Sequence, residues 1–507
     1  MLKTIECRIL KLEFKGGHGL ALHEFSRVEL DTILKNVVGK MLGEVDVNCV
    51  FDRTITNPKI TGIAGDVIEQ SVLGYPADSK KEADLLVDGI PTELKTTGIR
   101  EPKKDNDYIY EAKEPMSITA VSPVSIVHEE FESSSFWHKL EHLLLVYYHY
   151  DSHSTVKAAD YANFFIKGYH FHKFSPAERE ILKNDWLIVR DFIRQLQHDY
   201  SNPKEEYPRI SSEIRKQLML IDTAPKWPNA PRFRLKRAAV STLVQKHFGT
   251  KLEQLNKTYS SFKELDAELH KLTQKYKGKT VQEIMHELNM PIKLNAKGDV
   301  QKGIAEQIII QMFGAKSKKI SQIELFSKVG LMPRTVVQTT EGARTEDTKL
   351  FKIDFDEWTE PDAIFEESFI YNYFSAQQFL CIIFEEPSAK AKLLENKFIG
   401  FKRLVISEEL IQNDIRHLWN TVRNLVINKK LTETVTLKDG KPRINKNGTI
   451  RTELNFPKSK HHTFFVRGAG KDSSYKNFEL NGIKMYTQYV WMKGSVINKM
   501  LEEVKYI

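Results

Sequence analysis

Pairs of short motifs in the two halves of the chain are separated by a nearly constant distance, 237 or 239 residues. The pairs are VGKMLGE (38–44) with KGKTVQE (277–283), DVIEQ (66–70) with GIAEQ (303–307), and Lys95-Thr96 with Arg334-Thr335. Because three matches follow in the same order, they predict a duplicated domain. The alternative is chance similarity between amphipathic helices.

The length of the chain agrees with more than one domain. At 507 residues it exceeds the usual size of a single domain, about 100–200 residues. Residues 251–275 are rich in Lys, Glu and Leu and contain neither Pro nor Gly, which is typical of a helical connector. We therefore expect an N-terminal domain over residues 1–255 and a C-terminal domain over residues 256–507.

Composition narrows the class of protein. The formal charge of +8 suits a polyanionic partner, although ordinary basic proteins share it. The three cysteines form no CxxC pair, which argues against a Cys-rich zinc site. The N-terminus lacks the pattern of a signal peptide, and the longest apolar run, 140–150, is too short to span a bilayer. We expect a cytoplasmic protein without a membrane partner.

Helical and strand patterns alternate in the first half. The helical segments are 24–43, 60–74 and 176–201, and the strand segments are 83–87, 92–97, 116–127 and 142–149. The first two strands are joined by Asp88-Gly89-Ile90-Pro91, whose Gly and Pro indicate a turn. This alternation predicts an α/β fold.

Charged residues gather around this predicted hairpin. Glu93 and Lys95 flank Leu94, so their side chains leave the same face of the strand. The turn brings Asp84 beside them, and Glu69 lies on the preceding helix. Two carboxylates and an ammonium group are suited to Mg²⁺ and to phosphodiester hydrolysis. The alternative is a surface hairpin, because Glu-x-Lys triplets also occur elsewhere in this chain.

The order of these motifs resembles the MutH mismatch-repair nicking endonuclease. It is more similar still to the Sau-type restriction endonucleases, which cut at GATC. The segments that carry the resemblance are 39–44, 65–69, 84–96 and 137–140. The spacing from Asp84 to Glu93 is slightly longer here than in MutH, and a longer turn at Asp88-Gly89 accommodates the difference.

The resemblance implies an α/β fold of the PD-(D/E)xK class, with a mixed β-sheet, in two tandem MutH-like domains. It implies that Asp84 and Glu93 bind Mg²⁺ and that Lys95 is the catalytic lysine. Glu69 would be a helix carboxylate of the catalytic site, and Lys139 an additional active-site lysine.

In Sau-type enzymes the second domain has lost its catalytic residues, and the internal repeat behaves in the same way. Met332 falls at the position of Glu93, Arg334 at that of Lys95, and Ile323 near that of Asp84. Since methionine does not ligate Mg²⁺, the C-terminal domain is expected to be a catalytically degenerate, DNA-binding effector domain. The alternative is an unrelated C-terminal domain.

Basic residues near the end of each half are candidates for DNA contacts. By resemblance to the late strand of MutH-like enzymes, the candidates in the first half are Lys226, Arg232, Arg234, Lys236 and Arg237. By resemblance to the DNA-contacting end of the second domain in Sau-type proteins, the candidates in the second half are Arg467, Lys471 and Lys493. Arginine can bind guanine edges, and lysine mostly neutralises phosphates. The alternative is an ordinary solvated basic edge.

Together these features predict a Mg²⁺-dependent type II restriction endonuclease that cuts double-stranded DNA at GATC, before the G. Its second domain would bind another copy of the site as an effector. One catalytic site per chain implies either a dimer on DNA or sequential nicking, and a cognate DNA methyltransferase would be the partner in the system. The alternatives are a MutH-like nickase and a two-domain protein that binds DNA without cutting it.

Overall fold

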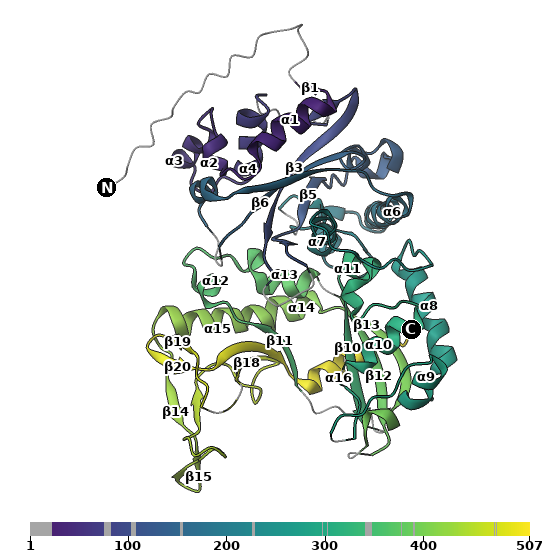
Figure 1. The fold of residues 1–507 in the computed structure, drawn as a ribbon, viewed down its shortest axis with the longest axis vertical. Helices are drawn as coiled ribbons and strands as arrows, with labels where there is room; N and C mark the ends of the chain where they lie inside the picture. The colour runs from purple at the N-terminus through teal and green to yellow at the C-terminus, as the bar shows by residue number, and fades with distance from the viewer. Residues whose placement is uncertain are drawn as a thin grey trace. The chain divides into compact units, whose positions relative to one another are not determined.

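The computed structural model describes residues 23–507 except 76–82, 103–107, 153–155, 226–228, 297, 302, 340–346, 377, 389–390, 471 and 473. These residues form two compact units (Figure 1). The first contains the described residues up to 152, together with 156–265 and 321–330, and the second contains 266–320 and 331–507. Among the described residues, no helix combines the length and the apolar character that crossing a membrane requires.

The predicted division of the chain at residue 255 stays a prediction about domain organisation. The two compact units do not follow the order of the chain, because the segment 321–330 packs with the first unit although it lies far along the sequence.

A mixed sheet forms the centre of the first unit. Its strand order is β1-β2-β3-β6-β7, and β4 pairs with β3. The bounds are β1 Glu24–Phe25, β2 Leu85–Val87, β3 Ile90–Arg100, β4 Glu111–Ala112, β6 Leu143–His149 and β7 Ile166–His172. β3 pairs parallel with β6, and β6 pairs antiparallel with β7. Asp88 and Gly89 both have positive φ (49° and 77°), which closes the β2–β3 hairpin with a tight turn that suits the strand twist.

Helices from the N-terminal part cover one face of this sheet. They are α1 Arg27–Val37, α2 Leu42–Val45, α3 Arg53–Thr56 and α4 Ile63–Val67, and α4 continues into the wider turn η2 Ile68–Val72. Leu34 of α1 and Val67 of α4 are buried in one core with Leu94 of β3 and Leu144 of β6. Because side chains alternate along a strand, the neighbours of Leu94 leave the opposite face of β3.

Further elements complete the first unit. They are β5 Met116–Ala120, β8 Ile221–Asp222, β9 Arg232–Leu235, α5 Ser135–His138, α6 Pro176–Asp199, α7 Arg237–His247 and α11 Glu324–Val329. The small sheet has the order β5-β9-β8. In Figure 1, α6 and α7 lie on the side of β3 opposite α1, α2 and α4. The predicted helix 176–201 is thus α6, whose first turn is capped by Ser175 and Glu178.

Buried charge also holds the first unit together. Lys328 of α11 donates from Nζ to Glu178 Oε1 at 2.5 Å and to Glu324 Oε1 at 2.8 Å. Burial acts to raise the pKa of Glu178, but the charge and hydrogen bond of Lys328, with Ser175, lower it to about 2. A paired buried charge of this kind fixes the segment 321–330 to α6.

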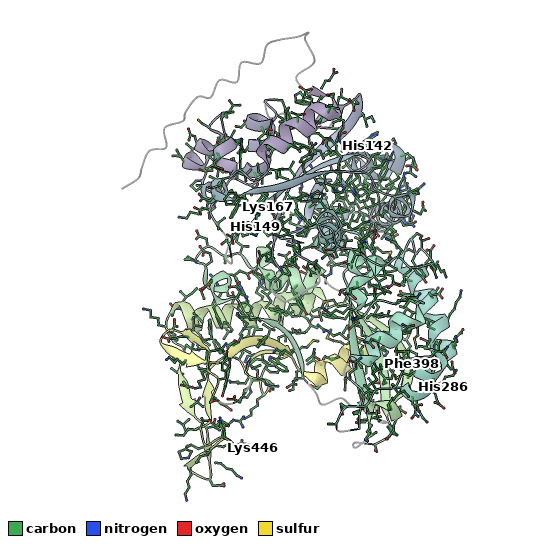
Figure 2. All side chains as sticks on the ribbon, in the orientation of Figure 1. His142, His149, Lys167, His286, Phe398 and Lys446 are labelled. Carbon is green, nitrogen blue, oxygen red and sulfur yellow. The ribbon has the colours of Figure 1, made fainter. Side chains whose placement is uncertain are left out.

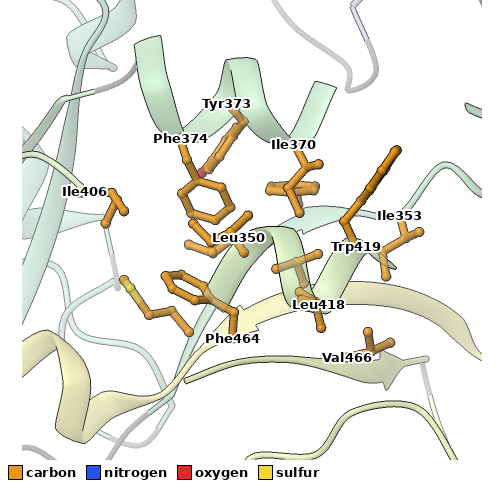
Figure 3. Close-up of a cluster of buried hydrophobic side chains, with 14 of the residues drawn as sticks. Leu350, Ile353, Ile370, Tyr373, Phe374, Ile406, Leu418, Trp419, Phe464 and Val466 are labelled. Carbon is orange, nitrogen blue, oxygen red and sulfur yellow. The ribbon is translucent and has the colours of Figure 1, made fainter. Parts of the chain in front are cut away.

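The second unit contains two three-stranded sheets and several helices. Its first sheet is β10 Leu331–Thr339, β12 Gln378–Glu386 and β13 Lys397–Leu404, and its second is β11 Thr348–Lys352, β21 Thr487–Met492 and β18 Phe464–Ala469. The helices are most of α8 Phe262–Tyr276, then α9 Val281–Glu287, α10 Ile304–Met312, α12 Phe355–Thr359, α13 Phe369–Ala376, α14 Glu408–Leu410, α15 Arg416–Ile427 and α16 Gly494–Glu502. Figure 3 shows part of the core, where Phe374, Leu418 and Phe464 pack together.

The two units share a local arrangement. β10 pairs parallel with β12, and β12 antiparallel with β13, as β3, β6 and β7 do in the first unit. Gly39 N donates to Ile166 O at 2.8 Å, and Gly278 N donates to Phe398 O at 2.8 Å. Both glycines have a positive φ, 87° and 84°. The repeated motifs at 38–44 and 277–283 therefore occupy matching positions within their own units.

The hairpin strand β2 has no matching strand among the described residues of the second unit, where β10 forms a sheet with β12 and β13 only. Ile323, the expected counterpart of Asp84, is the N-cap residue of α11 and is fully buried. The expected alignment of these two residues therefore places the residue that precedes strand β2 against the start of a helix.

Candidate active site

β3 carries Glu93 and Lys95 on one face, where their side chains meet. Lys95 Nζ lies 2.6 Å from Glu93 Oε1. Glu93 is only 1% exposed, and its backbone N–H donates to His142 O at 2.9 Å, which fixes it at the start of β6. Glu93 is therefore an interior carboxylate with compensating positive charge rather than a solvated surface group.

Lys139 completes the surroundings of Glu93. It follows the short helix α5, and its Nζ lies 2.9 Å from Glu93 Oε1 and 3.1 Å from Oε2. Phe136 and Trp137 anchor α5 in the core, with exposed fractions of 1% and 5%, and Ser134 Oγ accepts the N–H of Trp137. Two ammonium groups from distant parts of the sequence thus converge on one buried carboxylate.

Asp84 lies immediately before β2 and faces the same strand. Its Oδ2 accepts the N–H of Leu94 at 2.9 Å, which fixes the carboxylate beside the Glu93–Lys95 pair. Burial raises the pKa of Asp84, and the charge of Glu93 raises it further, while Lys95, the Leu94 N–H and Lys139 act in the opposite direction. Asp84 and Glu93 are therefore close enough to repel each other.

Glu69 lies on η2, where the helix widens and Leu73 N donates to Ile68 O at 2.9 Å. Burial raises the pKa of Glu69 to about 7, with further contributions from the charges of Asp84 and Asp66, and Lys95 opposes them. A carboxyl group with this pKa exchanges protons near neutral pH, which is the range useful for acid–base chemistry.

Asp84 and Glu93 are the residues that could hold a divalent cation. Mg²⁺ prefers oxygen ligands and is usually bound by one or two carboxylates together with substrate phosphates and water. Within the described ranges, no group of three or more His, Cys, Asp and Glu residues is placed to hold a metal ion. Water and a substrate phosphate are the usual further ligands of Mg²⁺ at a site with two carboxylates. Asp84 and Glu93 repel each other, and a divalent cation bound between them would reduce that repulsion.

The matching strand of the second unit has a different lining. Met332 packs against the apolar core, and the Arg334 guanidinium carbon lies 5.5 Å from the centre of the Phe379 ring. A cavity of about 290 Å³ is lined by Arg334, Phe379, Cys381, Leu404 and other residues of both sheets. At the positions of Glu93 and Lys95 this strand thus offers a thioether and a guanidinium, and no carboxylate.

Several of the predicted DNA-contact residues are at least partly exposed, and two of these are also paired with an aspartate. Arg232 is exposed at the start of β9, and Lys493 is partly exposed before α16. Arg234 pairs with Asp222 at 2.7 Å. Arg467 pairs with Asp347 at 2.8 Å and remains 44% exposed.

Other predicted DNA contacts lie deeper or outside the described residues. Lys236 is 2% exposed, and its Nζ donates to Leu218 O at 2.5 Å, so its expected place on an exposed basic strand is corrected to the interior. Arg237 donates from Nε to Ala112 O at 2.7 Å and also pairs with Glu111. Lys226 and Lys471 lie outside the described residues.

Comparison with known proteins adds an independent observation. Residues 73–185 match the family model described as DNA mismatch repair enzyme MutH. That span contains Asp84, Glu93, Lys95 and Lys139, and Glu69 lies just before it. The chain is also 24% identical over 411 residues to the type II restriction enzyme Sau3AI of Staphylococcus aureus, which covers 76% of this chain and 77% of the relative. This alignment is too long to be confined to the N-terminal 265 residues, so the similarity extends into the second unit.

Proposed function

We propose that the chain is a site-specific deoxyribonuclease of the MutH and Sau-type restriction endonuclease family, with a cleavage centre formed by Asp84, Glu93 and Lys95. The observation that carries this proposal is the buried Glu93 carboxylate, held between two ammonium groups with Asp84 alongside. Perturbed carboxyl groups gather at functional sites, and Asp84 and Glu69 beside Glu93 both have a raised pKa, unlike the compensated glutamates around Lys328.

The residues of this chain have separable tasks in phosphodiester hydrolysis. A water oxygen bonds to phosphorus while the bond to the leaving deoxyribose oxygen breaks, and that oxygen takes up a proton from solvent. Lys95 and Lys139 bring positive charge to the site where negative charge develops on the phosphate oxygens. Glu69, with a pKa of about 7, accepts a proton from the attacking water.

A divalent metal is expected because enzymes of this family generally use one, and we propose Mg²⁺ bound by Asp84 and Glu93. When bound, Mg²⁺ would polarise the scissile phosphate and lower the pKa of a coordinated water. Lys95 and Lys139 both pair with Glu93, one of the two proposed metal ligands. The catalytic site therefore has to exchange part of that pairing for metal coordination.

We further propose that the second unit is a degenerate copy that binds DNA without cutting it and acts as an effector. Its support is the shared strand arrangement and the shared Gly39 and Gly278 contacts. The replacement of Glu93 by Met332 removes a metal ligand, because a thioether is a poor ligand for Mg²⁺.

The recognition sequence GATC, cut before the G, is proposed from the Sau-type resemblance. The exposed or partly exposed Arg232, Arg467 and Lys493 are the strongest candidates for DNA contacts. One cleavage centre per chain requires a dimer on DNA or two successive nicks at a palindrome. A methyltransferase that modifies the same sequence would protect host DNA.

Plasmid digestion tests the proposed function. Supercoiled plasmids with and without GATC, adenine-methylated and unmethylated, are incubated with the full chain in Mg²⁺ or in EDTA. We expect linear fragments with GATC and Mg²⁺ and none with EDTA. Cutting at another sequence would contradict the specificity, and cutting in EDTA would contradict the metal requirement.

Two other functions make different predictions in the same assay. A MutH-like nickase would yield open circles that do not become linear. A protein that only binds DNA would retard the plasmid without breaking it. The similarity over 411 residues favours the restriction enzyme, because the MutH model matches only residues 73–185.

A further inference from the structure

A two-stranded arm extends from the second unit. Residues 433–454 leave the core after α15 and return to it at the buried Phe456. At its base, β14 Glu433–Val435 pairs with β17 Thr452–Leu454, and beyond it β15 Leu437–Lys438 pairs with β16 Lys441–Pro442. Figure 1 shows β14 and β15 reaching away from α15 and β18.

The arm ends in two ordered turns. Asp439 and Gly440 have positive φ, 52° and 75°, and connect β15 to β16 directly. In the second turn, Asn445 N donates to Thr449 O at 2.8 Å, and Ile444 forms a bridge with Ile450. Backbone hydrogen bonds thus define the shape of the arm without a core of its own.

Charge is unevenly distributed along the arm. Residues 436–451 contain five basic residues and one acidic residue. The side chains of Lys438, Lys441, Arg443 and Lys446 are all exposed, and Figure 2 shows Lys446 near the end of the arm.

The acidic residues at the base of the arm are paired instead. Glu433 pairs with Lys476, and Glu453 lies 3.9 Å from Arg451. Negative charge is therefore neutralised at the base, while positive charge projects from the turns.

We propose that this arm binds double-stranded DNA, with the ribbon in the major groove and its basic side chains on the phosphates. The proposal rests on the proposed function, which makes DNA the polyanion that this protein meets. Two paired strands lie about 4.8 Å apart, and the major groove, about 12 Å wide, admits such a ribbon. The arm would give the second unit a DNA contact separate from its degenerate catalytic strand.

Exposed apolar side chains on the arm are consistent with its insertion into the major groove of DNA. Leu437, Ile444 and Ile450 are 60%, 66% and 54% exposed. Apolar side chains in the major groove contact thymine methyl groups.

The test compares the wild type with K438Q/K441Q/R443Q/K446Q in the full chain. Binding to a fluorescent GATC duplex is measured in EDTA, to prevent cleavage, over a series of salt concentrations. Each phosphate contact contributes about 0.9 to the slope of log K against log salt, so we expect the slope to become shallower by about 2–4. The matched control K271Q/K277Q/K293Q/K505Q removes the same charge from exposed lysines elsewhere in the second unit, and its slope should equal that of the wild type.

A second variant addresses folding. Residues 436–451 are replaced by Asn-Gly, which can close Val435 onto its partner Thr452 as a two-residue hairpin. It should bind DNA as weakly as the quadruple variant and keep the thermal midpoint of the wild type.

Three results would overturn the proposal: a wild-type salt slope in both arm variants, an equal loss in the lysine control, or arm-dependent binding only to phosphatidylglycerol vesicles. If the wild type itself neither binds nor cuts the duplex, the proposed function has failed instead. The two failures are therefore distinguishable.

Discussion

β3 in the first unit and β10 in the second occupy matching places in their sheets, but only β3 has a carboxylate there. Each pairs parallel with the next strand of its sheet, which in turn pairs antiparallel with a third. Where β3 has Glu93 and Lys95, β10 has Met332 and Arg334. Since the same strand arrangement forms with a methionine in place of the glutamate, the Glu93 carboxylate is not required for this arrangement. Its presence is better explained by catalysis.

A second comparison, within the first unit, separates two kinds of buried charge. Glu93 is held by Lys95 and Lys139, and Lys328 is held by Glu178 and Glu324. The first cluster lies beside two further carboxyl groups with raised pKa, while the second lowers the pKa of its own glutamates. Carboxylates that repel each other are suited to binding a cation, as at Asp84 and Glu93. Carboxylates that are already paired with a lysine, as at Glu178 and Glu324, are suited to a structural link.

The largest effect is expected when β3 receives the residue of β10. Glu93→Met removes a proposed metal ligand and should lower the single-turnover rate of duplex cleavage by at least about 10²–10³-fold, the range for loss of one charge-stabilising group. The reciprocal Met332→Glu should leave that rate unchanged. Substantial cleavage by Glu93→Met would remove the basis of the comparison.

A subtler exchange concerns the lysine. Lys95→Arg keeps the positive charge but replaces a compact ammonium by a planar guanidinium. A displacement of about 1 Å at a reacting centre can cost about 10²-fold, and we expect a loss of that size in the cleavage rate. Cleavage by Lys95→Arg at the wild-type rate would show that Arg334 does not contribute to the proposed loss of cleavage activity in the second unit.

Substitution of Lys328, which pairs with Glu178 and Glu324, should change the stability of the protein rather than its cleavage rate. Lys328→Met leaves Glu178 buried without a cation and leaves Glu324 with Lys246 alone, which should lower the free energy of unfolding of the first unit by about 3–5 kcal/mol. Lys246 contacts the same Glu324 from a 45% exposed position. Lys246→Met is therefore the control, with an expected loss of at most about 1 kcal/mol in denaturant unfolding.

The smallest effect concerns pH. Burial lowers the pKa of His170 and of His172 on β7 to about 4, with further contributions from neighbouring positive groups, although Glu178 opposes the shift at His172. Because the unfolded chain binds these protons near pH 6.5 and the folded chain only near pH 4, stability present above pH 6.5 is lost as the pH falls through that window.

The second unit offers the replacement that tests this dependence. His172 pairs with Leu143, and at the matching place Leu404 pairs with Phe379. His172→Leu should therefore reduce the fall in thermal midpoint between pH 7.5 and pH 5. An unchanged fall would assign the pH dependence to other groups.

Local features of the sequence predicted the hairpin of the catalytic site well. The alternation around Leu94 and the Asp88-Gly89 turn are short-range signals, and β2 and β3 overlap the predicted strands 83–87 and 92–97. β3 already begins at Ile90, inside the predicted turn, and continues to Arg100. The contact between Lys139 and Glu93 joins residues far apart in sequence. Spacing alone could not supply it, and resemblance to a family did.

Long-range packing explains what the sequence did not predict. The basic alternation at 232–237 favoured exposure, yet Lys236 is buried because its ammonium reaches the Leu218 carbonyl before β8. The segment 321–330 looked like part of the second half, but Lys328 binds it to α6 of the first unit. Both outcomes depend on partners that no local pattern contains.

The central claim is that the chain cuts DNA at one place, beside Asp84. The most direct measurement is digestion of a GATC plasmid in Mg²⁺ by full-length Asp84→Asn, with the wild type as reference. We predict binding of the plasmid with neither nicked nor linear product. Persistent linear or open-circular DNA would contradict the claim and place a working cleavage centre elsewhere in the chain.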